Sequence, residues 1–320
     1  MEGVEVLTLS DYLRHPRKYD VLVCHAPNIR NHYMFLKRFH RRFDRIIFFF
    51  HGHEVMRMSS AYSAPYDFVV GHSALFWRFG RDFYDTLKLA LWRQYLPKLA
   101  GKSQFIFVSN AMLEEFIRFV RLQPADLGER CHVIYNAVGP LFEISSYDAE
   151  SPKKYDFITI RGDIDQSKYG VDIVNMLALH NPNLCFLLVG KGRFFEHVAK
   201  ADNLTWMEGT LSHREILELL DQCRCALMPT RLDAQGLMSC EFATYGLPLI
   251  TSDIPVCQEV FKDFDNVAFI SNDDPPRDIG PLLEVLCSGV PYDKNPLYFA
   301  ANTVMKEIDL LKKETGLGNY

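Results

Sequence analysis

PTRLDAQGLMSCEFATYGLPLITSD, residues 229–253, follows the apolar run Cys225–Pro229 and holds the polar residues on which the interpretation of this chain depends. Gly236 permits a sharp turn from a loop into a helical pattern, and the apolar run Pro248–Ser252 follows that pattern. A strand, a loop, a helix and a second strand in this order are typical of a parallel α/β sheet. Ligands of such sheets bind beyond the carboxyl ends of the strands, so this stretch predicts both a fold and a site.

The same alternation extends outward in both directions. The expected strands are Val4–Leu9, Asp20–His25, Arg45–His51, Gln104–Ser109, His132–Asn136, Asp156–Arg161, Leu184–Gly190, Leu204–Glu208, Cys225–Pro229 and Pro248–Ser252. Apolar residues recur at spacings of three and four over Tyr169–His180 and Ser212–Gln222, which predicts amphipathic helices. The polar stretch Ser145–Lys154 has the composition of a linker. We therefore expect two parallel-sheet α/β domains.

Composition excludes several classes of protein. Of 320 residues, 48% are hydrophobic and 23% charged, which is typical of a globular chain. Residues 1–150 carry 19 Lys and Arg against 16 Asp and Glu (net +3), and residues 151–320 carry 16 against 24 (net −8). This asymmetry suggests domains with different partners but is too small for a nucleic-acid-binding protein.

Localisation is inferred from the apolar runs and the cysteines. No apolar run approaches the 18 residues or so of a membrane span, and the N-terminus has no signal-peptide pattern. The eight cysteines are scattered, and most, such as Cys185, lie in apolar runs. We interpret them as buried hydrophobic residues of a cytoplasmic protein.

Two carboxylates stand out in the opening stretch. Asp233 lies in the loop after a strand, and Glu241 lies about two helical turns further on, where it would point back toward the same opening. A carboxylate among apolar neighbours requires partners, and a pair of ribose or sugar hydroxyls would serve. A structural salt bridge or a solvated Glu241 is the alternative.

Cations and glycines follow other expected strands. Arg161 and Lys168 flank a turn at the start of a helix, where they could neutralise a diphosphate without a metal or could be ordinary surface charges. Gly190-Lys191-Gly192 ends a strand and could approach an anion, although an ordinary turn explains it as well. His51 and His53 lack companion ligands for a metal, so a hydrogen bond from a histidine to a sugar hydroxyl, or a structural one, fits better.

The segment Arg30–Arg45 alternates cations with aromatic residues. On a helix, Phe35, Leu36, Phe39 and Phe43 would form one stripe and the cations another. The helix could lie on an anionic membrane surface, or its stripe could belong to the core.

Taken together, these motifs resemble glycosyltransferase family 4, the retaining GT-B nucleotide-sugar transferases. The residues that match the donor-site signature in register are Glu241, Ala243, Gly246, Pro248, Ile250, Ser252 and Asp253. Further motifs agree in order: VSNAM (108–112), VIYNAV (133–138), KYGVD (168–172), LLVGKG (187–192) and MEGTLSHREILELLDQC (207–223). The resemblance covers roughly residues 45–260.

The resemblance implies a GT-B fold, in which two Rossmann-like domains face a cleft. It implies an N-terminal acceptor-side domain over residues 1–148, a donor-binding domain over 149–300, and a C-terminal helix over 301–320 that packs back on the first domain. The expected activity is retaining, metal-independent and cofactor-free transfer of a sugar from a nucleoside-diphosphate sugar to a glycan or lipid-linked acceptor in bacterial surface polysaccharide synthesis. Peripheral binding to the inner face of the plasma membrane through residues 30–45 would fit such acceptors.

The resemblance also assigns residues to roles. Asp233 and His51 would face the transferred sugar as catalytic residues, and Glu241 would hold the donor ribose. The donor diphosphate would lie against Arg161, Lys168, Gly236 and Leu237, and the nucleotide pocket would be lined by Gly190, Lys191, Gly209 and Thr210.

Three departures favour alternatives. Asp233 stands where the family has glutamate, which shortens the side chain by about 1.5 Å, and Ala234 replaces a glycine. VEVLTL at residues 4–9 resembles the family's second strand, so the first strand with its glycine-rich loop is expected to be missing. A catalytically weak nucleotide-sugar-binding or scaffold protein is therefore the main alternative, and a GT-B sugar epimerase is a third.

Overall fold

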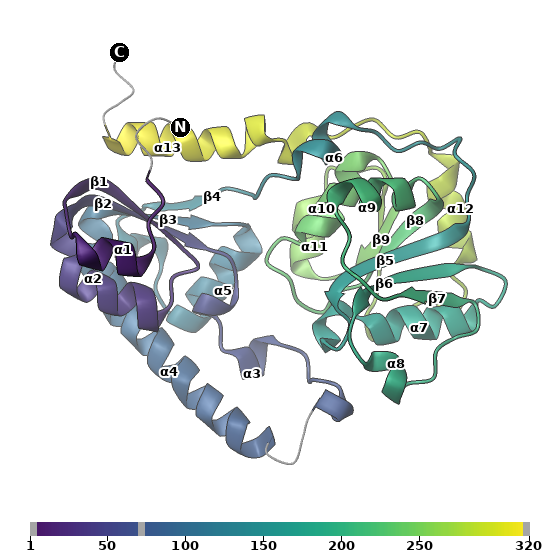
Figure 1. The fold of residues 1–320 in the computed structure, drawn as a ribbon, viewed down its shortest axis with the longest axis horizontal. Coiled ribbons are helices and arrows are strands. Elements are labelled where there is room, and N and C mark those ends of the chain that lie inside the picture. Colours follow the sequence, from purple (N-terminus) through teal and green to yellow (C-terminus); the bar gives the residue numbers. More distant parts are fainter. Residues whose placement is uncertain (1–4, 70–73, 316–320) are drawn as a thin grey trace. The chain divides into compact units, whose positions relative to one another are not determined.

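The chain divides into two compact units (Figure 1), and the computed structural model describes residues 5–69 and 74–315. The first unit draws on Met1–Arg57, Tyr84–Ile134 and Lys306–Tyr320, and the second on Met58–Phe83 and Tyr135–Met305. The division differs from the boundary expected after residue 148, because residues 58–83 and 135–148 group with the second unit.

The sheet of the first unit has four parallel strands in the order β1-β2-β3-β4. The strands are β1 (Tyr19–His25), β2 (Phe43–Phe50), β3 (Ser103–Phe107) and β4 (Cys131–Val133). Successive side chains of β2 point to opposite faces, and all five from Ile46 to Phe50 are buried. Phe48 and Phe50 stack on Phe105 and Phe107 at ring-centroid distances of 5.5 and 5.1 Å. These rings form the core on one face of the sheet.

Helices cover both faces of this sheet. Trp92 of α4 (Ala74–Leu99) and Phe116 of α5 (Asn110–Val120) contact the phenylalanine rings, at 6.3 Å from Phe48 and 5.0 Å from Phe107. On the opposite face, Leu310 and Leu311 of α13 (Val304–Thr315) pack against Ile47, Phe49 and Ile106. The last helix therefore completes the core of the first unit (Figure 1). The remaining elements of this unit are α1 (Leu9–Arg14), η1 (Ile29–Tyr33), α2 (Met34–Phe39), η2 (His40–Arg42), η3 (His53–Val55), η5 (Ala100–Lys102) and η6 (Pro124–Leu127).

Two predictions for the N-terminal region are wrong. The first is the strand expected over Val4–Leu9: of the part that the structure describes, residues 5–8 form no strand and Leu9 begins α1. The Thr8 side chain caps this helix by accepting the N–H of Asp11. A single helix over Arg30–Arg45 is also wrong, because helical structure ends at Arg42 and Phe43 begins β2. Leu36 and Phe39 are buried, as a core stripe requires, while Lys37 and Arg38 are exposed.

The second unit holds a six-stranded parallel sheet in the order β10-β9-β8-β5-β6-β7. The strands are β5 (Tyr155–Asp163), β6 (Phe186–Lys191), β7 (Leu204–Met207), β8 (Cys223–Met228), β9 (Leu249–Ser252) and β10 (Val267–Ile270). The chain first adds strands on one side of β5 and then, from β8, on the other side. The order therefore reverses between β5 and β8, which is where open α/β sheets bind ligands.

Helices pack on this sheet through apolar faces, as the periodicity predicts. Val174 and Leu177 of α7 (Val171–His180) and Leu283 of α12 (Gly280–Ser288) share one core cluster with Phe157 and Phe186 of the sheet. The other helices are α3 (Met58–Ala61), η4 (Asp67–Val69), α6 (Pro140–Ile144), η7 (Ser167–Tyr169), α8 (Phe194–His197), α9 (His213–Leu220), α10 (Leu237–Tyr245), α11 (Pro255–Phe261), η8 (Pro296–Tyr298) and η9 (Ala300–Asn302). The predicted α/β fold with two parallel sheets is confirmed.

All eight cysteines are free thiols, and five of them are buried. Cys185, interpreted as buried, is exposed, because it lies in the turn just before β6 rather than in the strand.

Gly190 marks a close approach between β6 and β5. A Cβ at residue 190 would lie 2.2 Å from the carbonyl oxygen of Arg161 and 2.8 Å from a methyl carbon of Ile164. At Gly192 a Cβ would lie 2.6 Å from Ile164. Both glycines are therefore needed for packing against the end of β5 and the residue that follows it.

We predict that Gly190→Ala destabilises the protein by about 1–3 kcal/mol, since the backbone of β5 must shift to admit the methyl group. Gly162→Ala is the matched control, because a Cβ there meets nothing within 4 Å. Urea unfolding of both variants measures the effect. Equal midpoints for the two variants would contradict the proposed close fit.

Candidate functional site

The reversal of strand order in the second unit places loops from distant parts of the sequence side by side. Arg161 lies in β5, and residues 229–236 follow the adjacent strand β8. The residues predicted to bind the donor diphosphate and ribose lie in β5, in η7 before α7, in the loop after β8 and in α10.

Arg161 is buried, with 7% of its surface exposed. Its Nη2 donates to the carbonyl oxygen of Pro229 at 2.7 Å, and its guanidinium carbon lies 5.1 Å from the centroid of the Tyr169 ring. The Nε atom is buried and has no hydrogen-bond partner among the described residues. Burial lowers the pKa of Arg161, and the nearby Asp233 carboxylate opposes this effect. The site thus holds a buried cation with one unused donor.

Lys168 contacts the same aromatic ring as Arg161, from which it is separated by seven positions in the sequence. Its Nζ atom lies 4.7 Å from the centroid of the Tyr169 ring, the same ring that Arg161 contacts, and 5.5 Å from the Tyr62 ring. Cations over aromatic faces are attracted by the ring quadrupole. Both cations that the sequence predicts for a diphosphate therefore contact the Tyr169 ring, and their contact with a diphosphate stays a prediction.

Asp233 is held by the backbone of its own loop. Its Oδ1 atom accepts the N–H groups of Ala234 at 2.8 Å, Gln235 at 3.3 Å and Gly236 at 2.8 Å. Gly236 adopts a left-handed φ of 73° just before Leu237 begins α10, which explains why glycine stands there. The Gly236 N–H, predicted to bind a diphosphate, donates to Asp233 in this structure.

Glu241 is buried within α10, with 6% of its surface exposed. Its Oε1 atom accepts the N–H of Gly139 at 3.1 Å. A Cβ at residue 139 would lie 3.0 Å from Nδ1 of His213 and 3.2 Å from Oε1 of Glu241. The absence of a side chain at Gly139 therefore allows the His213 and Glu241 side chains to approach its backbone. Burial raises the pKa of Glu241, while the Gly139 N–H and the nearby His213 lower it. No pattern in the sequence indicates that Gly139 and His213 are neighbours of this carboxylate.

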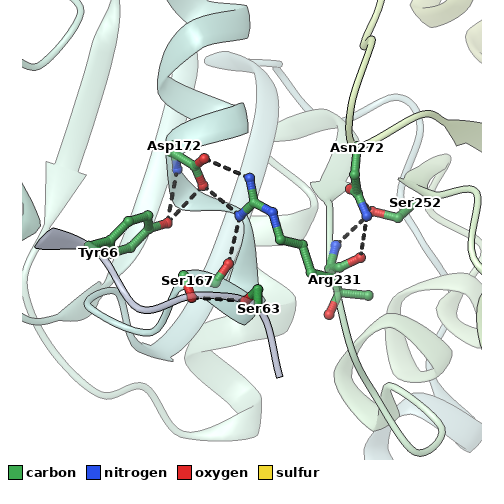
Figure 2. A network of polar contacts seen from close by, with 8 residues as sticks. Ser63, Tyr66, Ser167, Asp172, Arg231, Ser252 and Asn272 are labelled. Carbon is green, nitrogen blue, oxygen red and sulfur yellow. Dashed lines mark hydrogen bonds and ion pairs between the residues drawn. The ribbon is translucent and has the colours of Figure 1, made fainter. Parts of the chain in front are cut away.

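Figure 2 shows a polar network in the same unit that the sequence did not predict. The Arg231 guanidinium donates to both carboxylate oxygens of Asp172, at 2.9 and 2.7 Å, and to the carbonyl of Ser167 at 2.7 Å. The Tyr66 hydroxyl donates to Asp172 at 2.8 Å. Arg231 and Asp172 both lie within motifs recognised in the sequence, but 59 positions separate them.

The same loop is tied to β9 and to the loop after β10. The Thr230 N–H donates to the Ser252 hydroxyl at 2.8 Å, and the Ser252 hydroxyl donates to Asn272 at 2.6 Å. Asn272 in turn donates to the Thr230 carbonyl at 3.0 Å. These bonds fix the loop that carries Arg231 and Asp233.

The predicted nucleotide-pocket residues lie along the other half of this sheet. Gly190 and Lys191 end β6, the neighbour of β5, and the Gly190 carbonyl accepts the indole N–H of Trp206 at 2.9 Å. Gly209 and Thr210 follow β7, two strands away from β5. Contact of these four residues with a nucleotide stays a prediction.

His51 belongs to the first unit, directly after β2. Its Nε2 atom lies 3.2 Å from Nδ1 of His25, and its backbone N–H donates to the buried Glu54 carboxylate. Burial lowers the pKa of His51, which Glu54 partly opposes, and burial together with His51 lowers the pKa of His25. The lowered pKa indicates that the His51 imidazole is neutral at neutral pH. Its contact with a sugar stays a prediction.

Within the described part of the chain, His, Cys, Asp and Glu side chains form no group of three or more that could hold a metal ion. Over the same residues, no helix combines the length and the apolar character that crossing a membrane requires.

Comparison with known proteins matches one segment of the second unit to a family. Residues 162–286 match the family described as glycosyl transferases group 1. No curated protein shows significant sequence similarity to the chain.

Solved structures resemble the chain over most of its length. Sucrose-phosphate synthase from Thermosynechococcus elongatus matches with a TM-score of 0.69 and 13% identity, over 97% of this chain and 78% of that one. WaaG, a glycosyltransferase involved in lipopolysaccharide biosynthesis, matches at 0.58 with 16% identity, over 87% and 80%. Pneumococcal O-GlcNAc transferase GtfA, in a complex with UDP and GlcNAc, matches at 0.58 with 12% identity, over 96% and 59%.

These likenesses define the fold of the chain, and the family model matches a part of it. The fold is that of the GT-B glycosyltransferases, with two parallel-sheet α/β units. Residues 162–286, which lie in the second unit, match the model of glycosyl transferases group 1. It spans 59% of the length of the GtfA/B and GtfA chains that it resembles.

We predict that Glu241→Gln is more stable than the parent at neutral pH, and that this advantage in the free energy of unfolding becomes smaller at acid pH. Because burial raises the pKa of Glu241, its favourable contribution is complete below the unfolded glutamate pKa of about 4.5 and is lost as pH rises through the higher folded pKa. Glutamine keeps an oxygen for the Gly139 N–H but carries no charge. Thermal unfolding from pH 4 to 8 measures the difference, with the exposed Glu218→Gln as control. A stability difference that does not change with pH would contradict the prediction.

Proposed function

We propose that the protein is a retaining, metal-independent glycosyltransferase that moves a sugar from a nucleoside-diphosphate sugar to a glycan or lipid-linked acceptor. One observation carries the proposal: Arg161 and Lys168 contact the same Tyr169 ring, at 5.1 and 4.7 Å, where the strand order reverses. Two cations beside one ring could meet the negative charges of a diphosphate. The group 1 family match and the UDP bound by GtfA support this ligand class.

The proposed chemistry is electrostatic. As the sugar leaves, negative charge grows on the terminal phosphate, and Arg161 and Lys168 stabilise it; the buried Nε of Arg161 is one donor available for this. The acceptor hydroxyl attacks from the same face as the leaving group, and the phosphate takes its proton. Glu241 holds the ribose hydroxyls, and Asp233 lies toward the transferred sugar.

An acceptor in bacterial surface polysaccharide synthesis is proposed for the same site. WaaG, which resembles this chain in fold, is involved in lipopolysaccharide biosynthesis. Such acceptors are handled at the inner face of the plasma membrane, so we propose a cytoplasmic protein that binds this surface through exposed cations of residues 30–45.

A catalytically weak nucleotide-sugar-binding protein is the second candidate. Asp233 favours it, because this shorter acid already accepts three backbone N–H groups of its own loop. Transfer assays with donor and acceptor distinguish the two candidates.

We predict that three alanine variants fail in different ways. Lys168→Ala lowers turnover and weakens donor binding, because phosphate charge grows in the transition state. Glu241→Ala mainly raises the donor KM, because ribose contacts are equal in ground and transition states. Asp233→Ala lowers transfer and leaves affinity for the free nucleoside diphosphate nearly unchanged. In each variant the affected quantity (turnover, donor KM or transfer rate) is expected to change by about 10- to 150-fold, as for the loss of one charge-assisted hydrogen bond of about 1.5–3 kcal/mol.

Calorimetric binding of nucleoside diphosphates and nucleotide sugars, together with transfer assays, tests these variants. Lys262→Ala and Glu218→Ala serve as controls, since both side chains are exposed on the same unit. If all three folded variants bind nucleotide sugar like the parent, the donor site lies elsewhere. A parent that binds donor but transfers to no lipid-linked glycan supports the second candidate.

We also predict salt-sensitive binding to anionic vesicles through Lys37, Arg38 and Arg41, which are exposed on α2 and η2. Each cation near such a surface contributes about 1 kcal/mol. Reversal of all three charges to glutamate should abolish sedimentation with anionic vesicles. Reversal of the exposed Arg214, Lys262 and Arg277 in the second unit is the control. Equal sedimentation with neutral vesicles would defeat the prediction.

A further inference from the structure

Met58–Val69, here called the docked segment, precedes the second unit's sheet by many residues yet packs on it. Tyr66 and Phe68 pack against the core cluster of that sheet. The ring of Tyr66 lies 4.9 Å from that of Phe194, and Phe68 stacks on His197 at 4.5 Å. The docked segment is therefore anchored on this sheet by the partial burial of two aromatic side chains.

A charged clamp joins the docked segment to the loop after β8. Asp172 accepts the Tyr66 hydroxyl at 2.8 Å and both arms of Arg231, as Figure 2 shows. Although burial raises it, the pKa of Asp172 is held below its ordinary value by the hydrogen bonds from Arg231 and Tyr66. Asp172 is therefore ionised at neutral pH, and the clamp is a bidentate ion pair with a third donor.

The clamp acts on the backbone that carries Lys168. Arg231 donates through its side chain to the Ser167 carbonyl at 2.7 Å and through its backbone N–H to the Lys168 carbonyl at 2.7 Å. The docked segment adds a contact between the hydroxyls of Ser63 and Ser167 at 2.9 Å, and it places the Tyr62 ring 5.5 Å from the Lys168 ammonium. The segment and the clamp thus hold both the backbone and the side chain of Lys168.

We propose that Tyr66 and Arg231 are positioning residues for Lys168, and that docking of Met58–Val69 is coupled to binding of a nucleoside diphosphate. The inference rests on the proposed function, in which Lys168 binds the diphosphate. A lysine side chain has four rotatable bonds, and immobilising it on binding costs affinity. The clamp and the docked segment restrict the Lys168 side chain before the ligand binds, so less conformational entropy is lost on binding. Coupling is reciprocal, so the nucleotide must also stabilise the docked segment.

The test is calorimetric binding of UDP, GDP, ADP, CDP and dTDP to the full chain. Tyr66→Phe removes one hydroxyl and keeps the packed ring. It is expected to raise the Kd of the bound nucleotide roughly 3- to 30-fold. Tyr147→Phe is the matched control: its hydroxyl donates to the Cys223 carbonyl at 2.6 Å in the same unit, and its loss should leave the Kd unchanged.

A double-mutant cycle shows whether Tyr66 acts through Lys168. In a Lys168→Ala background, Tyr66→Phe should change the Kd no further. In hydrogen exchange, the nucleotide should slow exchange of the amides of residues 58–69 in the parent, and less so in Tyr66→Phe.

The outcomes separate this inference from the proposed function. A parent that binds none of the five nucleotides overturns both. A parent that binds one, with Tyr66→Phe binding it equally well or with unchanged exchange in residues 58–69, overturns the coupling and leaves the proposed function standing. Equal losses of affinity in Tyr66→Phe and Tyr147→Phe would show general destabilisation and would also overturn the coupling.

Discussion

Burial of the Arg161 guanidinium is the constraint on which the rest of the candidate site depends. A cation removed from water is costly unless polar groups surround it. Here the Pro229 carbonyl accepts one of its N–H groups, the Tyr169 ring lies beneath it, and the Asp233 carboxylate supplies opposite charge. Each of these groups belongs to a loop that is held in place by other bonds. The buried Nε remains without a partner, so an incoming anion would complete the arrangement.

Glycines allow these loops to approach closely enough to share the cation. Gly170 has a left-handed φ of 61°, and a Cβ there would lie 3.1 Å from the Pro229 carbonyl. This carbonyl is the acceptor of Arg161, so the start of α7 and the loop after β8 meet at the same point. Gly190 plays the same part on the other side, against the carbonyl of Arg161 itself. Bulk at either glycine would therefore disturb the position of the arginine.

Most of the fold, and less of the site, could be predicted from the sequence. Buried parallel strands are continuous apolar runs, so runs such as 46–50 were recognised directly. The strand predicted over residues 4–9 is wrong, because an apolar run forms a strand only where a neighbouring strand pairs with it. Val6 is 95% exposed, and Thr8 caps a helix. The strand β10 was missed because Val267–Ile270 is short and lies between acidic loops. The Tyr66–Asp172 contact joins residues 106 positions apart, and no local pattern encodes such a pair.

The three cations around this site differ in what already neutralises them. Arg231 is paired with both oxygens of Asp172, and Arg161 is opposed by Asp233. Lys168 forms no ion pair in the described part of the chain and rests on the rings of Tyr62 and Tyr169. An aromatic face attracts an ammonium less strongly than a phosphate does, so Lys168 is the cation that can exchange its partner at least cost. The fixed pair of Arg231 and Asp172 then determines where this exchangeable charge lies, and that is why a structural ion pair belongs to the account of a binding site.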